Sequence, residues 1–147
     1  MLEVGERIVL GDVGIDWPER RRLFLTNRRL VLFQGKGLLR RYYVKAREYS
    51  IGQIEEAYVA ERGGGDSWTD YHLAIRMKGG EERECTFSSK RYELRTNIEW
   101  ANAINGLIDN RSDHTLRRYS EGRRGWVWRQ FRAGSLPKIQ RKNLSEA

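Results

Sequence analysis

Short runs of arginine and lysine are the residues of this chain best suited to chemistry, because the guanidinium fork binds phosphates and carboxylates in pairs. The runs enter the second expected strand and follow the third: Arg20, Arg21, Arg22, Arg40, Arg41 and Lys45. If these side chains converge, they predict a site for an anion or an anionic lipid. The simpler alternative, favoured by composition, is a solvated surface balanced by the 17 acidic residues among residues 1–110.

Catalytic and metal chemistry has no candidate constellation in the sequence. Cys85 is the single cysteine, and His72 and His114 do not stand at the spacing of a nucleophilic or metal site. We expect Cys85 to be a buried apolar residue and His72 to face solvent. Gly35-Lys36-Gly37 lacks the GxxxxGK[ST] pattern of a phosphate loop. The prediction is therefore a protein that is not an enzyme and that holds no metal or other cofactor.

The charge of the chain is concentrated in its last residues. The net charge of the 147 residues is +8, of which residues 1–110 carry +1 and residues 111–147 carry +7. This split predicts a nearly neutral domain over 1–110, followed by a basic segment over 111–147. No apolar run approaches the roughly 18 residues of a membrane span, and the first residues do not read as a signal peptide. We expect a cytoplasmic protein, free or peripheral at a membrane.

Arginines alternate with aromatic residues in the basic segment: Arg123, Arg124, Trp126, Trp128 and Arg129. This mixture suits nucleic acid, through phosphate pairing and base stacking. It also suits an anionic membrane surface, and nucleic acid is the less favoured of the two. Residues 125–132 are expected to form a short helix. The segment is either a linker toward a partner subunit or another domain, or it packs back on the domain.

Seven strands are expected to position these residues. Apolar, β-branched and aromatic patterns predict them near residues 6–10, 22–25, 30–33, 42–44, 54–59, 71–77 and 82–87. Thr26-Asn27-Arg28-Arg29 predicts a tight hairpin, because asparagine tolerates the left-handed backbone that such turns require. Gly35-Lys36-Gly37 and the three glycines at 63–65 predict loops.

The period of the apolar residues becomes helical from about Ser89 to Ile108, although Asn97 and Asn105 interrupt the arc. The arc is wider than packing on one sheet needs, and its flank is formed by Trp100, Ala103 and Leu107. An uncovered apolar flank predicts a protein interface. The alternative, slightly favoured, is that Trp126, Trp128 and Phe131 of the basic segment cover this flank.

Two motifs carry a resemblance to a known family. Gly5-Glu6 precedes an apolar strand, and Leu25-Thr26-Asn27-Arg28-Arg29-Leu30 forms the following hairpin. This pair resembles the opening of pleckstrin-homology-like domains of the GRAM and bacterial type. The resemblance covers roughly residues 3–110 and implies a mainly β fold with a C-terminal helix. That fold is a bent seven-stranded sheet or partial barrel, capped by one long helix and here followed by the basic segment.

The first residues are also similar to the start of the GLUE domain, the pleckstrin-like module of an ESCRT-II subunit. That resemblance implies a non-catalytic recognition module that binds ubiquitin, anionic lipid or both in a protein-sorting complex. In this sequence Val13-Gly14-Ile15 departs from the order of the corresponding family element. The alternatives are a prokaryotic-type pleckstrin or GRAM domain for membrane-surface or protein association, and nucleic-acid binding through residues 111–147.

Overall fold

Over the residues that the structure describes, the fold is mainly β, with two antiparallel sheets and one α-helix. The computed structural model describes residues 1–15, 21–37, 39–40, 42–62, 70–85, 93–109, 116–120 and 126–130. The first sheet has the order β1-β2-β3-β4. Its strands are β1 (Ile8–Ile15), β2 (Arg21–Thr26), β3 (Arg29–Lys36) and β4 (Tyr42–Ser50). A short 3-10 helix, η1 (Ile51–Gln53), leads into the second sheet.

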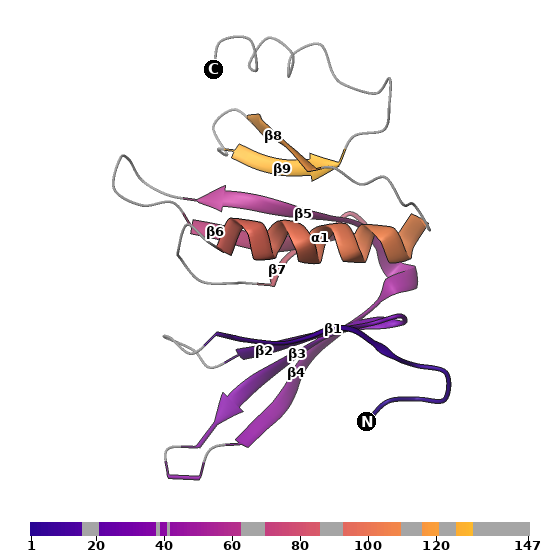
Figure 1. The fold of residues 1–147 in the computed structure, drawn as a ribbon, viewed down its shortest axis with the longest axis vertical. Coiled ribbons are helices and arrows are strands. Elements are labelled where there is room, and N and C mark those ends of the chain that lie inside the picture. Colours follow the sequence, from indigo (N-terminus) through magenta and orange to yellow (C-terminus); the bar gives the residue numbers. More distant parts are fainter. Residues whose placement is uncertain are drawn as a thin grey trace.

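The second sheet has the order β7-β6-β5-β9-β8. Its first three strands along the chain are β5 (Ile54–Arg62), β6 (Asp70–Met77) and β7 (Glu82–Cys85). The helix α1 (Glu93–Asp109) follows, and then the hairpin β8 (Leu116–Ser120) and β9 (Trp126–Gln130). Figure 1 shows α1 running across β5 and β6, with the first sheet below both the helix and the second sheet. Seven strands followed by a helix is the order that the resemblance implies.

The core lies where the first sheet, the second sheet and α1 meet. Leucines that alternate along β2 and β3 point into it, and they pack with residues from β5, β6 and α1. The completely buried members include Leu25, Leu30, Ile54, Leu73, Ile75 and Ile104. The alternation expected along Tyr71–Met77 is confirmed, because Leu73 and Ile75 face this core. The other face of β6 is also covered, since Ala74 is buried against Tyr58 and Val127.

Asn97 and Asn105 do not weaken the helix but attach it to the second sheet. The side chain of Asn105 accepts a hydrogen bond from Ala57 N at 2.8 Å and donates one to Ala57 O at 2.9 Å. Asn97 Nδ2 donates to Tyr71 O at 3.2 Å. Strand β9 pairs with β5 at Val59 and Ala60. At Ala57, the Asn105 amide therefore supplies the hydrogen-bond partners that β9 supplies further along β5. Buried backbone N–H and C=O groups need such partners.

Several expected elements differ from the structure. Gly35 and Lys36 are not a loop, because they pair with Tyr43 and Tyr42 and extend β3. The short helix expected over 125–132 is wrong where the structure describes it, since Trp126–Gln130 is a strand. His72 is half-buried rather than exposed. The glycines at 63–65 lie outside the described residues, as do Arg20, Arg41, His114, Arg123, Arg124 and Phe131.

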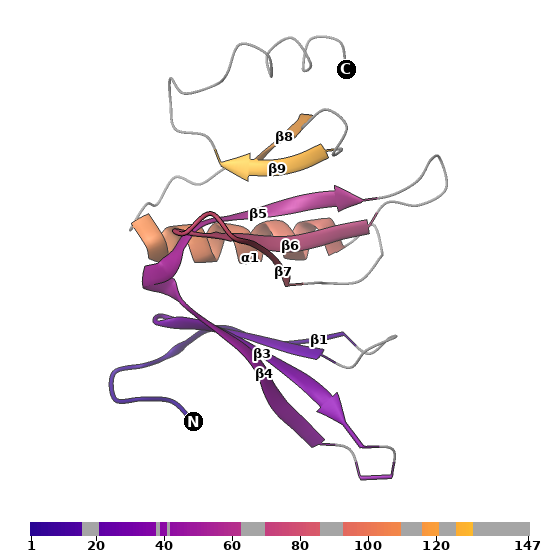
Figure 2. The same ribbon diagram turned by 180° about the vertical axis from the view of Figure 1, so that it is seen from behind.

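The hairpin β8–β9 joins residues of the basic segment to the second sheet. Val59 is opposite Trp128 and Ala60 is opposite Val127, in an antiparallel pairing. Figure 2 shows β9 continuing the layer formed by β5 and β6. Among the described residues, no helix is long and apolar enough to cross a membrane.

Candidate ligand-binding face

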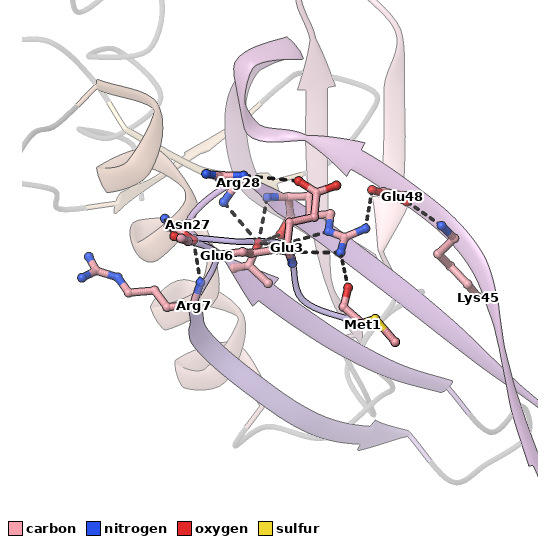
Figure 3. A network of polar contacts seen from close by, with 11 residues as sticks. Met1, Glu3, Glu6, Arg7, Asn27, Arg28, Lys45 and Glu48 are labelled. Carbon is pink, nitrogen blue, oxygen red and sulfur yellow. Dashed lines mark hydrogen bonds and ion pairs between the residues drawn. The ribbon is translucent and has the colours of Figure 1, made fainter.

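Glu6 of the first motif and Arg29 of the second form an ion pair beside the β2–β3 turn (Figure 3). Arg29 Nε donates to Glu6 Oε1 at 2.7 Å, and Arg29 Nη2 donates to Glu6 Oε2 at 3.1 Å. The Glu6 side chain has no exposed surface. The hydrogen bonds from Arg29, then the backbone N–H of Glu3 and the Thr26 hydroxyl, lower the pKa of Glu6 to about 2. Glu6 is therefore a buried, ionised acceptor.

The other polar residues of the motif fix the same turn. Thr26 Oγ1 donates to Glu6 Oε1 at 2.7 Å and accepts from the backbone N–H groups of Arg28 and Arg29. Asn27 Oδ1 accepts from Arg7 N at 2.8 Å, and Asn27 Nδ2 donates to Gly5 O at 3.2 Å. Gly5 has a φ of 77°, which favours glycine. The motif residues thus attach the N-terminal segment to the hairpin, and their role is structural.

An open groove lies on the face of the first sheet that points away from the core. Because Leu23, Leu25 and Leu30 point inward, the alternating residues Phe24 and Val31 point outward. The groove has a volume of about 510 Å³ and is lined by Met1, Leu2, Ile8, Phe24, Thr26, Arg29, Val31, Phe33 and Lys45. We call these residues the outer groove. The Phe24 and Phe33 rings meet edge to face, with centroids 5.6 Å apart.

Two cations flank the outer groove at Phe33. Arg22 on β2 and Lys45 on β4 both lie opposite Phe33 in the strand register. The Arg22 guanidinium lies over the Tyr43 ring, 4.7 Å from its centroid. Lys45 Nζ donates to Glu48 Oε2 at 2.7 Å (Figure 3). Lys45 and then Arg29 lower the pKa of Glu48 by hydrogen bonding.

The structure does not bring the described residues of the predicted anion site together on one face of the first sheet. Arg21 and Arg22 are successive residues of β2, so they point to opposite faces of the sheet. Arg22 and Lys45 share the outer face, whereas Arg40 is exposed in the β3–β4 turn. Of the four described cations of this set, Arg21 therefore lies on the face opposite Arg22 and Lys45, while Arg20 and Arg41 lie outside the described residues. The outward-facing side chains of Phe24 and Phe33 were not predicted to line a groove. A signal for them was present, because β2 and β3 are apolar at consecutive positions, which indicates burial or binding on both faces of the sheet.

The β3–β4 turn presents an apolar tip. Gly37 has a φ of 85°, and a Cβ there would lie 2.2 Å from Arg40 O, so only glycine fits this tight approach. Leu39 is fully exposed next to Arg40. Tyr42 and Val44, on the strand that leaves the turn, are also exposed. Figure 2 shows this end of β3 and β4 projecting away from α1 and the second sheet.

The predicted interface on the helix is mostly internal. Trp100 is only 2% exposed and belongs to the core, so the expectation that it lies on an uncovered flank is wrong. Ala103 and Leu107 are half-buried and pack against the same core. The flank is narrower than expected because the first sheet also contributes side chains to this core. Trp128 packs against this core too.

Arg118 and Arg129 of the basic segment pair with carboxylates of the second sheet. Arg118 binds Glu61 on β5 through two hydrogen bonds of 2.9 Å, and Trp128 Nε1 donates to the same carboxylate. Arg129 lies 3.0 Å from Glu56 Oε1 and stacks over the Tyr58 ring. Trp126 is covered by the Arg118 guanidinium, 4.1 Å from its ring centroid. Trp126, Trp128 and Arg129 therefore hold the hairpin in place.

Cys85 lies in the core, as expected. It is 2% exposed, and burial raises the pKa of its thiol to about 12, against the weaker opposing effect of Arg47 and Arg21. Its thiolate is therefore scarce at neutral pH. Within the described ranges, no group of three His, Cys, Asp or Glu residues could hold a metal ion.

Comparisons with known proteins give a match among solved structures alone. No protein-family model matches the sequence, and no curated protein matches it. Among solved structures, the chain is similar to a pleckstrin homology domain from Shewanella amazonensis. The sequence identity is 17%, the TM-score is 0.42, and the match covers 69% of this chain and 88% of that chain.

Proposed function

We propose that this chain is a non-catalytic recognition module that docks on anionic membrane surfaces through the tip of the β3–β4 hairpin. The observation that carries the proposal is the turn itself. Gly37 fixes a tight backbone that holds Leu39 fully in solvent, where an apolar side chain gains nothing from the fold. Such a side chain is suited to insertion between lipid headgroups.

The surroundings of the tip suit a membrane interface. Arg40 is beside Leu39, and each basic residue near an anionic leaflet contributes about 1 kcal/mol to binding. Tyr42 is exposed on the adjoining strand, and tyrosine favours the depth of the headgroups. Arg22 and Lys45, on the outer face of the same sheet, add positive charge that attracts an anionic membrane.

Co-flotation with lipid vesicles tests this function. The chain is expected to float with phosphatidylcholine vesicles that contain phosphatidylserine, and to float less as salt is raised. Leu39→Asp is expected to abolish flotation, whereas Val4→Asp, a matched change at another exposed apolar residue, preserves it. Equal flotation with and without phosphatidylserine, or an unchanged Leu39→Asp variant, would reject membrane docking by the tip.

Ubiquitin binding in an ESCRT-type sorting complex is the competing function. Its support from the helix is reduced to the half-buried Ala103 and Leu107, because Trp100 is in the core. A titration of the isotope-labelled chain with ubiquitin separates the two functions. Shifts confined to α1 that disappear in Leu107→Asp would favour ubiquitin, and shifts at the β3–β4 turn with vesicles favour the membrane.

A further inference from the structure

The floor of the outer groove is formed by apolar side chains that point away from the core. Phe24, Val31 and Phe33 stand on adjacent strands, with Phe24 opposite Val31 in the register. They form a stripe on the face away from α1, and Ile8 on β1 borders it with about half of its surface exposed. Gly11 helps to shape the floor, because a Cβ there would lie 3.1 Å from the Phe24 ring. An apolar stripe on the outside of a sheet is a candidate binding surface.

The first residues turn this stripe into a groove. Met1 O accepts a hydrogen bond from Arg29 Nη2 at 2.9 Å (Figure 3), and Glu3 N donates to Glu6 Oε2 at 2.8 Å. These bonds hold Met1 and Leu2 beside the sheet face, where both line the groove. The volume of about 510 Å³ is in the range of small-molecule sites.

Charge at the groove favours an anionic headgroup. Lys45 lines the groove with about half of its side chain exposed, and its ammonium group can reach solvent. Glu48 lies beside it, held between Lys45 at 2.7 Å and Arg29 at 2.8 Å. Arg29 also pairs with the buried Glu6, so Arg29 and Lys45 together balance the charges of Glu6 and Glu48 and leave no net negative charge. Arg22 adds a further cation on the other side of Phe33.

We propose that the outer groove binds a single-chain anionic amphiphile, with its alkyl chain along Ile8, Phe24 and Phe33 and its headgroup at Lys45. A fatty acid and a lysophospholipid share this chemistry. The proposal does not depend on membrane docking by Leu39, because the groove and the turn are built from different residues.

Titration of the full chain with soluble amphiphiles of one chain length tests the proposal. The probes are dodecanoate, lauroyl lysophosphatidate, dodecyl maltoside and dodecyltrimethylammonium, each below its micellar concentration. We expect saturable amide shifts around Phe24, Val31 and Lys45, and binding of the anions at least tenfold tighter than that of the cation. Tighter binding of the lysophosphatidate identifies a phospholipid as the source of the ligand, and tighter binding of dodecanoate identifies a fatty acid. Equal binding of the cation, or the absence of saturable shifts, would overturn the proposal.

Two substitutions locate the chain and the headgroup. Ile8→Trp fills the groove from a half-exposed position and is expected to weaken dodecanoate binding at least tenfold. Lys45→Ala is expected to weaken the anions about tenfold and leave dodecyl maltoside unchanged. Leu39→Trp and Lys78→Ala are the matched controls, and both are expected to bind as the parent chain does. Circular dichroism verifies that each variant is folded. A folded Ile8→Trp variant that binds dodecanoate like the parent contradicts the proposal, whatever the vesicles show.

Discussion

Arg29 bridges a buried carboxylate, Glu6, and a half-exposed one, Glu48, with a single guanidinium group. The same group also donates to Met1 O. Arginine suits this position because its planar fork offers donors in several fixed directions, which the lysine ammonium group cannot do. One side chain thus connects the N-terminal segment, the β2–β3 turn and β4.

The pKa of Glu6 implies that the stability of the fold depends on pH. The folded value of about 2 is below the ordinary value of 4.5, so the folded state favours the ionised carboxylate. This contribution is present above pH 4.5 and is lost as the pH falls toward 2. We expect the urea midpoint to fall through this window. In Glu6→Gln the midpoint is lower at neutral pH and changes less with acid. A parallel pH dependence in both chains would show that other groups cause it.

Replacement of Asn105 by alanine is expected to destabilise the fold by about 2–4 kcal/mol. Both Ala57 N–H and Ala57 C=O lose a buried hydrogen-bond partner, at a cost of about 1–3 kcal/mol each. Glu99→Ala, on the exposed side of α1, serves as the control and is expected to have little effect. Urea unfolding followed by circular dichroism measures both. Equal stability of the two variants would mean that water replaces the amide.

Gly37→Ala is expected to disturb the β3–β4 turn. A left-handed backbone costs an L-residue about 1–2 kcal/mol, and the contact with Arg40 O adds to this cost. Gly79→Ala is the matched control, because nothing lies within 4 Å of its Cβ position. Because the altered turn no longer holds Leu39 in place, Gly37→Ala should also lose vesicle binding. A Gly37→Ala chain with parental stability and amide shifts would show that the turn adapts.

Glu61→Ala is expected to loosen the β8–β9 hairpin. The substitution leaves the Arg118 guanidinium and Trp128 Nε1 without their shared acceptor, at a cost of about 1–3 kcal/mol. Amide hydrogen exchange at Val59 and Trp128 should become faster, while exchange in β6 changes little. Glu55→Ala, an exposed carboxylate on the same strand, is the control. Unchanged exchange at Val59 would mean that backbone pairing alone holds the hairpin.

The order of strands and the helix could be predicted because these features depend on local patterns. The Thr26–Arg29 hairpin is confirmed, and the alternation along β6 and the helical period gave the correct elements. The roles of Asn97 and Asn105 could not be predicted, because they depend on backbone groups of β5 and β6 that are distant in the sequence. The outer groove was missed for a similar reason. Phe24 and Leu25 are both large apolar residues, so the sequence does not tell which of them faces the core, and only the packing does.

The pairing of β9 with β5 has a consequence for shortened forms of the chain. Without residues 116–130, the backbone groups of Val59 and Ala60 would become an open sheet edge, next to apolar side chains now covered by Leu116 and Trp128. Open edges of this kind recruit strands from neighbouring molecules. A chain ending at residue 110 is therefore expected to self-associate as its concentration rises, because the β8–β9 hairpin no longer covers this edge.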